Sequence, residues 1–216
     1  MSTPTVYVVD DDAAVCDSVT LLLQTAHIGA KAYNSAEAFL ADYSSAMEGC
    51  ILLDIRMPLV SGPELQLELI RRGSILPIIY LSAYGDVPTT VRAIKNGAVD
   101  VLTKPVNPTS LLENVHAAFE LHAQRATEHK AVAHAQHKLA LLTPREQEIL
   151  ALIVNGESSK VVARRLDISF RTVEVHRTHI MQKMEVDSLL ALTALADACG
   201  LATGRIMTPH HTARPR

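Results

Sequence analysis

The segment that decides the fold is Cys50-Ile51-Leu52-Leu53-Asp54-Ile55-Arg56-Met57-Pro58, an apolar run that ends in a carboxylate and a turn. Such a run is typical of a buried strand. Open α/β sheets place their chemistry at the carboxyl ends of their strands, so we expect Asp54 at such an edge. Other polar residues follow apolar runs in the same way: Asp10-Asp11-Asp12 after 6–9, Ser82 after 78–81 and Lys104 after 99–102.

Short apolar strands alternate with helix-period segments through the first 120 residues. This alternation indicates βαβ units and a doubly wound parallel sheet. We predict strands near 5–10, 29–33, 49–54, 77–82 and 99–103, and helices near 13–26, 35–46, 62–72 and 88–96. A further helix begins after Asn107-Pro108 and loses its apolar face beyond about Leu121.

The rest of the chain predicts a second, all-α domain. The stretch before it is rich in Ala, His, Gln and Lys, which is typical of an exposed helical linker. Thr143-Pro144-Arg145-Glu146 is a capping box that starts a helix, and Ser158, Ser169 and Ser188 are candidate caps for three more. We therefore predict four parts: an α/β domain over 1–120, a helical linker over 121–139, a helical domain over 140–201 and a disordered tail over 202–216.

The composition of the chain limits the cellular locations and the binding partners that we expect. The chain of 216 residues is 48% hydrophobic, yet no apolar stretch approaches the roughly 20 residues that cross a bilayer. Its three widely separated cysteines favour buried, reduced thiols over disulfides. We therefore expect a cytoplasmic protein that does not bind membranes. Residues 1–120 hold 7 Lys+Arg against 14 Asp+Glu and residues 140–200 hold 7 against 8, so any nucleic-acid binding depends on where the charges point.

Several carboxylates crowded at one strand edge repel one another, and a divalent cation with oxygen ligands is the simplest remedy. Mg²⁺ is the ion we expect there. With Mg²⁺ and Lys104 neutralising charge, Asp54 could attack a phosphoryl donor and become an acyl phosphate, while Ser82 donates a hydrogen bond to a phosphate oxygen. Each residue alone is more often a cap, a turn residue or a solvated charge. Their joint placement on four strands favours the chemical site.

The predicted helix 170–184 has one apolar stripe and one mixed stripe. Val173, Ile180 and Met184 share the stripe that would face a core. The opposite side suits a major groove, where an apolar group meets a thymine methyl and polar groups meet base edges and phosphates. This side holds Arg171, Val175, Thr178 and Gln182, flanked by Thr172, His179 and Lys183. A short helix, the turn 166–169 and this helix together form a helix-turn-helix layout.

These motifs resemble a known family over nearly the whole chain. Residues 5–120 resemble the receiver domain of bacterial two-component response regulators, and the second domain brings the match closest to the FixJ-like branch of the NarL/LuxR group. The receiver motifs are Val8-Val9-Asp10-Asp11-Asp12, Asp54-Ile55-Arg56-Met57-Pro58, Gly85-Asp86-Val87-Pro88, Gly97-Ala98-Val99-Asp100 and Lys104-Pro105. The second domain matches through Leu142-Thr143-Pro144-Arg145-Glu146 and Arg171-Thr172-Val173-Glu174-Val175-His176-Arg177.

The resemblance implies a role for each receiver residue and a strand order of 2-1-3-4-5 in a five-stranded sheet. Asp54 would be the phosphoacceptor, and Asp11 and Asp54 would bind Mg²⁺ with the backbone carbonyl of Arg56. Asp10 would act through a coordinated water, and Ser82 and Lys104 would sense the phosphate. One position departs from the pattern: Val101 stands where such receivers usually carry an aromatic residue that turns inward on activation.

The resemblance also implies how the second domain meets DNA. Glu174, Val175 and Thr178 occupy positions that face bases in relatives, and Lys160 and Lys183 are candidates for phosphate contacts. We therefore predict a transcription regulator that is not an enzyme. A histidine kinase would phosphorylate Asp54, and phosphorylation would promote homodimers that bind promoter DNA and work with RNA polymerase.

Two other functions stay open at this point. A metal-dependent phosphotransferase or phosphatase would turn over small phosphate esters, although Arg56 stands where such an enzyme would carry a second acid. A phosphorelay or RNA-binding module would use residues 140–200 as an interaction surface. Turnover well beyond one phosphate per chain would identify the enzyme, and binding of duplex DNA by the phosphorylated protein distinguishes the regulator from the binding module.

Overall fold

The computed structural model describes residues 3–83, Ile94 and residues 97–199. The chain divides into two compact units, Met1–Thr127 and Glu128–Arg216. The predicted helix near 88–96, except for Ile94, and the predicted tail over 202–216 lie outside the described residues. No helix among the residues described is long and apolar enough to span a membrane.

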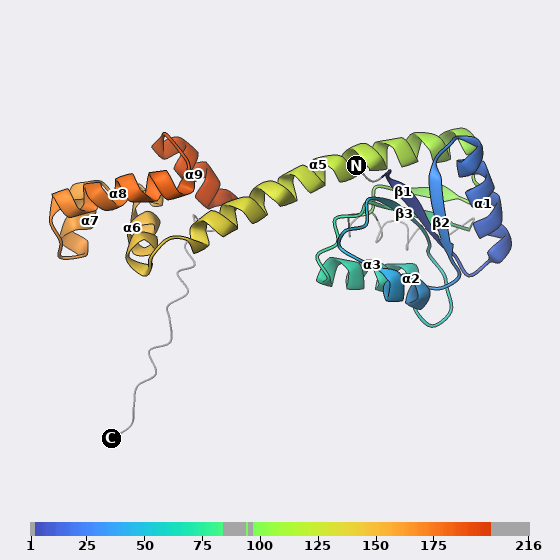
Figure 1. Cartoon of the computed structure of the whole chain (residues 1–216). Helices are drawn as coiled ribbons and strands as arrows, with labels where there is room; N and C mark the ends of the chain where they lie inside the picture. The colour runs from blue at the N-terminus through green and yellow to red at the C-terminus, as the bar shows by residue number, and fades with distance from the viewer. Residues whose placement is uncertain (1–2, 84–93, 95–96, 200–216) are drawn as a thin grey trace, which may run out of the picture. The chain divides into compact units, whose positions relative to one another are not determined.

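The first unit is built on a parallel sheet with the predicted topology (Figure 1). All four strand pairs are parallel, and the strand order is β2-β1-β3-β4-β5, which confirms the doubly wound fold. The strands are β1 (Thr5–Val9), β2 (Gly29–Tyr33), β3 (Gly49–Asp54), β4 (Ile78–Ser82) and β5 (Asp100–Thr103). The central position of β3 brings its carboxyl end to the middle of the sheet edge.

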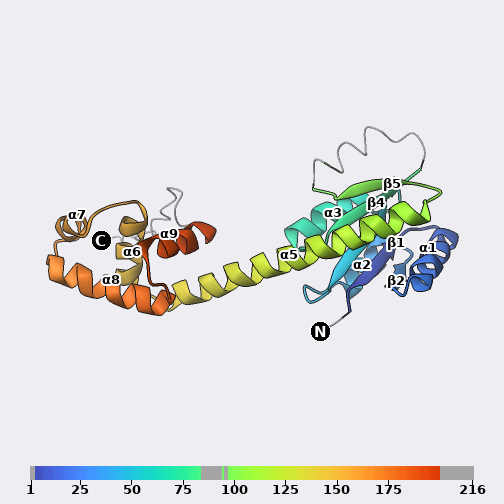
Figure 2. The same cartoon turned by 90° about the horizontal axis from the view of Figure 1, so that it is seen from above.

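Helices cover both faces of the sheet (Figure 2). Helices α1 (Ala13–Thr25) and α5 (Pro108–Ala140) lie on one face, and α2 (Ala36–Asp42) and α3 (Gly62–Arg71) lie on the other. Alternate residues of β3 enter the two cores: Leu52 packs toward α1 and α5, while Leu53 packs toward α2 and α3. Because both faces are covered, β3 is apolar at nearly every position, as parallel strands usually are.

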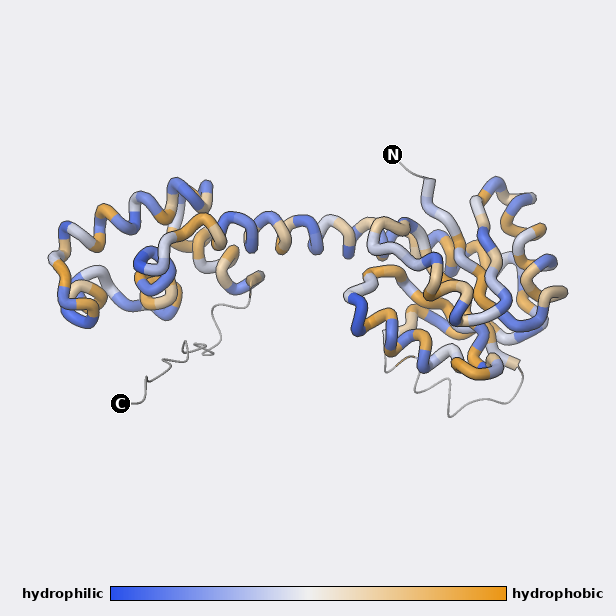
Figure 3. Tube along the Cα trace, turned by 60° about the horizontal axis from the view of Figure 1, so that its bottom comes forward, coloured by the Kyte–Doolittle hydropathy of each residue, from blue (hydrophilic) through white to orange (hydrophobic). Residues whose placement is uncertain are grey.

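Helix α5 is one continuous helix of 33 residues. It includes the whole predicted linker, and its middle carries no continuous apolar run (Figure 3). Its exposure differs from the expectation, because Ala135 and Lys138 are buried and Leu139 packs against the core of the second unit. The last turns of α5 therefore belong to the packed part of that unit.

The second unit is a helical bundle, as predicted. Its helices are α6 (Pro144–Val154), α7 (Ser159–Arg165), α8 (Phe170–Met184) and α9 (Leu189–Ala198). The capping box of Thr143 and Glu146 is present at the start of α6, and the hydroxyls of Ser169 and Ser188 cap α8 and α9. These caps fix where the helices begin, and the apolar faces of the helices then meet in one core.

Gly62 at the start of α3 lies against the end of β3, and we predict that Gly62→Ala destabilises the first unit. A Cβ at this position would lie 2.3 Å from the backbone oxygen of Asp54 and 2.9 Å from Cε1 of Tyr80. Overpacking of this kind costs about 1–3 kcal/mol. All five tyrosines lie in residues 1–127, so urea unfolding followed by tyrosine fluorescence reports on this unit alone.

The matched control is Gly29→Ala in β2, where a new Cβ would meet Thr5 Oγ1 at an ordinary 3.7 Å. An unfolding midpoint for Gly62→Ala equal to that of the control would contradict the close approach of α3 to β3.

Candidate functional site

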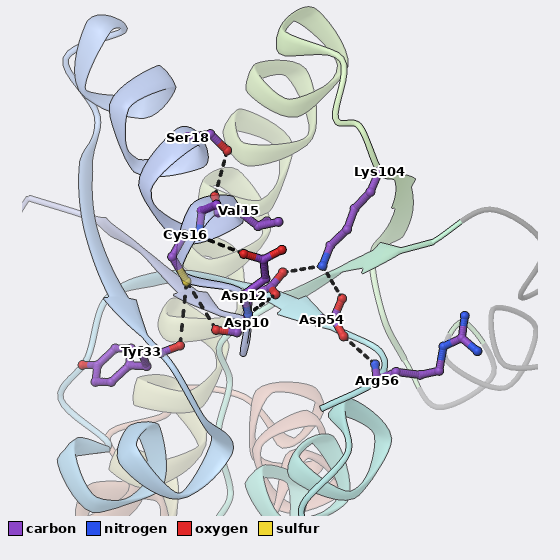
Figure 4. Close-up of polar contacts among 10 residues, drawn as sticks. Asp10, Asp12, Val15, Cys16, Ser18, Tyr33, Asp54, Arg56 and Lys104 are labelled. Atoms are coloured by element: carbon purple, nitrogen blue, oxygen red, sulfur yellow. Dashed lines mark hydrogen bonds and ion pairs between the residues drawn. The ribbon is translucent and has the colours of Figure 1, made fainter. Parts of the chain in front are cut away.

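Polar residues stand at the ends of four strands along the carboxyl edge of the sheet, and Lys104 contacts two of the others, Asp10 and Asp54 (Figure 4). Asp10 follows β1, Asp54 ends β3, Ser82 ends β4 and Lys104 follows β5. Because the strands are parallel, their carboxyl ends share one edge. The structure thus joins Asp10, Asp54 and Lys104 at the edge that the sequence predicted and places Ser82 at the end of the strand between β3 and β5.

The ammonium of Lys104 joins the two buried acids. Lys104 Nζ lies 2.5 Å from Asp10 Oδ2 and 2.5 Å from Asp54 Oδ1, and both carboxylates are almost fully buried. Two buried anions this close together would repel strongly without a cation. Burial alone would lower the pKa of Lys104, but its contacts with the carboxylates of Asp10 and Asp54 outweigh burial and raise it. The lysine therefore stays charged.

The side chain of Asp54 is held in place by two donors, but its burial disfavours the ionised form. Burial raises the pKa of Asp54, and Lys104 opposes that effect. The backbone N–H of Arg56 donates to Asp54 Oδ2 at 2.6 Å, so each carboxylate oxygen has one donor. A carboxylate fixed in this way at the edge of the sheet is arranged to act as a nucleophile.

The loop after β1 is held by its own hydrogen bonds. The backbone N–H of Asp12 donates to Asp10 Oδ1 at 3.0 Å, and Asp12 Oδ1 accepts from the N–H of Ala14 at 2.9 Å. Asp12 therefore caps α1, and Asp11, which lies between these two acids, is exposed. Cys16, a residue that the sequence did not single out, donates its thiol to the backbone oxygen of Asp10 at 3.4 Å. Burial, followed by the nearby Asp10, raises the pKa of this thiol to about 11.

Ser82 and Val101 are the two positions that the sequence resemblance links to activation. Ser82 is buried, and its hydroxyl donates to the backbone oxygen of Ala83 at 3.0 Å. Val101 packs with the core under α2 and α3, while Leu102 packs with the core under α1 and α5. The small side chain at 101 is thus integrated into the sheet packing.

Helix α8 buries and exposes the residues that its periodicity predicts. Val173, Ile180 and Met184 are fully buried in the core. Helix α7, a turn with Asp167 in the left-handed region at φ 51°, and α8 form the predicted helix-turn-helix layout. The exposed residues of α8 include Arg171, Thr172, Glu174, Val175, Thr178, His179 and Gln182.

Three cations around α8 differ in whether they have protein partners. Lys183 Nζ lies 2.7 Å from Oε2 of the buried Glu146, and Arg177 donates to Ser159 Oγ at 2.8 Å. Lys160 is exposed, and no ion pair involves its ammonium within the described part of the chain. The pairing of Lys183 competes with the predicted phosphate contact. Sequence patterns identify Glu146 as a cap but carry no signal for its distant partner.

Comparisons with known proteins match both units. Residues 6–116 match the response regulator receiver domain, and residues 140–196 match the luxR family of bacterial regulatory proteins. The transcriptional regulatory protein FixJ of Bradyrhizobium diazoefficiens is 39% identical over 91% of this chain and 96% of its own length. The chain belongs to the FixJ-like response regulators.

Other similar proteins also match most of the chain and are likewise named as regulators. The transcriptional regulatory protein TdiR of Thauera aromatica is 45% identical over 85% of this chain and 81% of its own length. The structure of the response regulator StyR matches with a TM-score of 0.72 and 38% identity, covering 91% of this chain and 99% of that one. This response regulator is therefore a DNA-binding transcriptional regulator of a two-component system.

Receiver domains generally bind Mg²⁺ at the phosphorylation site, and the donor set of this response regulator fits that ion. No group of three or more His, Cys, Asp or Glu side chains positioned to bind a metal occurs within residues 3–83, 94 and 97–199. Mg²⁺, however, typically takes only one or two carboxylates and completes its shell with water and phosphate oxygens. The buried Asp10 Oδ2 accepts no well-directed hydrogen bond among the described residues and has only the ion pair with Lys104, so it has acceptor capacity to spare.

We predict that Lys183→Met destabilises the second unit of the response regulator by about 2 kcal/mol near pH 7, because it leaves the buried carboxylate of Glu146 without its cation. Burial alone would raise the pKa of Glu146, but Lys183 and Thr143 hold it at about 2. The stabilisation is therefore complete above the ordinary value of 4.5 and disappears as the pH falls through about 2. Hydrogen–deuterium exchange of peptides from residues 140–198 measures both effects.

Lys160→Met, which removes an exposed lysine from the same unit, is the matched control and should leave the exchange unchanged. Equal protection in the two variants would show that the ion pair contributes nothing.

Proposed function

We propose that this protein is a phosphorylation-dependent switch in which an acyl phosphate on Asp54 controls DNA binding by α8. The observation that carries the proposal is the Asp54 carboxylate, which is held by Lys104 and by the N–H of Arg56 at the sheet edge. A receiver domain implies a histidine kinase partner, and a luxR-family domain implies DNA binding. We further propose that the protein acts in the cytoplasm, where promoter DNA and RNA polymerase lie.

The reaction is a phosphoryl transfer. An oxygen of Asp54 forms a bond to the phosphorus of a phosphohistidine on the kinase as the P–N bond breaks, and the departing imidazole takes up a proton. Lys104 already lies against Asp54 and can follow the charge onto the phosphoryl oxygens. Ser82, buried at the end of the neighbouring strand, supplies a hydroxyl that can donate to one of those oxygens.

Asp10, Asp11, Asp54 and the backbone carbonyl of Arg56 are the groups that we propose to hold Mg²⁺. The ion would neutralise negative charge on the phosphoryl group. Two of these groups come from consecutive residues after β1, and the other two come from the end of β3 and the residue two positions later. Local hydrogen bonds, such as that from the N–H of Asp12 to Asp10, keep this loop ordered.

Asp54→Asn should abolish labelling of the protein by acetyl phosphate with Mg²⁺, because the amide has no nucleophilic carboxylate oxygen. Phosphate-affinity gel electrophoresis measures the phosphorylated fraction. Asp12→Asn is the matched control, since asparagine caps a helix as well as aspartate does and the residue caps α1. Labelling that persists in Asp54→Asn, or is lost in Asp12→Asn, would contradict the assignment.

The second half of the proposal concerns promoter DNA. We propose that phosphorylation promotes homodimers whose α8 helices enter major grooves about one DNA turn apart. Residues proposed for DNA contact are Lys160, Arg171, Thr172, Glu174, Val175, Thr178, His179 and Lys183. Val175 supports this proposal because it is an apolar side chain that remains 47% exposed on a face otherwise made of polar groups. A valine so placed can contact a thymine methyl.

Val175→Glu should lower the affinity for promoter DNA by at least about tenfold, because a carboxylate would replace the apolar contact in the groove. Electrophoretic mobility shifts with the phosphorylated protein measure this loss, and circular dichroism checks that the helices remain. Leu141→Glu is the control: it adds the same charge to an exposed apolar site outside α8. Promoter affinity that falls equally in both variants would show that charge alone, and not the face of α8, decides binding.

A further inference from the structure

The polar groups on and beside the exposed face of α8 differ in how much hydrogen-bonding capacity they have left. Thr178 Oγ1 donates to the backbone oxygen of Glu174 at 3.0 Å, so its hydroxyl proton is already used. Arg177 and Lys183 bind Ser159 and Glu146. The hydroxyl proton of Thr178 is therefore not available to a base, and Arg177 and Lys183 are each held by a protein partner although they keep further N–H donors.

Glu174 has acceptor capacity to spare. Its side chain is 48% exposed, and its charged neighbour Arg177 lies 3.9 Å away, beyond hydrogen-bond distance. An ionised carboxylate accepts hydrogen bonds and donates none. The bond to Ser159 holds Arg177 beside this carboxylate, so its positive charge offsets part of the repulsion between Glu174 and DNA phosphates.

A carboxylate in the major groove discriminates among the four bases by charge. It is repelled by the acceptors of guanine, O6 and N7, and by O4 of thymine. Adenine offers an amino group but places the acceptor N7 beside it, whereas cytosine offers its N4 amino group with no acceptor on the same base edge. The neighbouring Val175 is apolar and half-exposed, and suits a thymine methyl.

We propose that Glu174 is a specificity-determining residue that selects a cytosine in each half-site of the operator. The inference rests on the proposed DNA-binding function and adds one base to it. It also explains how an acidic residue can be accommodated on a face that approaches a polyanion. The carboxylate gains a hydrogen bond from one base, and the nearby charge of Arg177 reduces its repulsion by the phosphates.

The test is selection of binding sites from a random duplex library by the full-length protein phosphorylated with acetyl phosphate and Mg²⁺. The wild type should select a cytosine at one position of each half-site. In Glu174→Ala the preference at that position should fall by about tenfold or more, with the other positions unchanged. Glu174→Gln, which is nearly isosteric, should shift the preference toward adenine, because a glutamine amide pairs with N6 and N7 of that base.

Glu148→Ala is the matched control. It removes an exposed glutamate from α6 that pairs with Arg145 at the same i,i+3 spacing, so the change in net charge is identical. Its consensus should equal that of the wild type. A cytosine preference that survives in Glu174→Ala, or a different wild-type base at the position that this variant affects, would overturn the cytosine assignment alone. A wild type that selects no sequence at all would overturn the proposed function together with it.

Discussion

The ion pairs of Lys104 are the constraint on which the candidate site at the sheet edge depends. They allow two acids from different strands, Asp10 and Asp54, to stay buried at a distance where mutual repulsion would otherwise protonate or separate them. Burial still raises the pKa of Asp54, so Lys104 offsets only part of the unfavourable free energy of burying this charged group. In the proposed reaction, a phosphoryl group on Asp54 would bring further negative charge to a lysine that already pairs with two carboxylates. Its effect would be to redistribute contacts that exist before the reaction.

Most of the fold could be predicted because its signals are local. The strand boundaries follow from apolar runs such as 50–53, and the starts of α6 and α8 follow from caps at Thr143 and Ser169. The exposure of the linker was predicted less well, since Lys138 looks like a solvated residue until its ion pair with Glu185 at 2.9 Å is known. Its partner lies far away in the sequence, and periodicity carries no information about such contacts.

The candidate site shows the same division. The convergence of Asp10, Asp54 and Lys104 could be predicted because a parallel sheet aligns the ends of its strands. The hydrogen bond from Cys16 to the backbone of Asp10 could not, because a buried cysteine in an apolar stripe is indistinguishable from ordinary packing. Lys183 was expected at a phosphate, yet the structure pairs it with a buried glutamate, and only tertiary packing could show this.

The hydroxyl of Ser82 has one proton, and in this structure the carbonyl of Ala83 holds it. To engage an acyl phosphate the side chain must exchange one acceptor for another, leaving that carbonyl to find a new donor. One neutral hydrogen bond contributes about 1 kcal/mol, so this exchange alone can bias two conformations by a factor of only about five. A larger ratio of active to inactive protein would then require the proposed dimerisation, because self-association amplifies a small initial bias through its dependence on concentration.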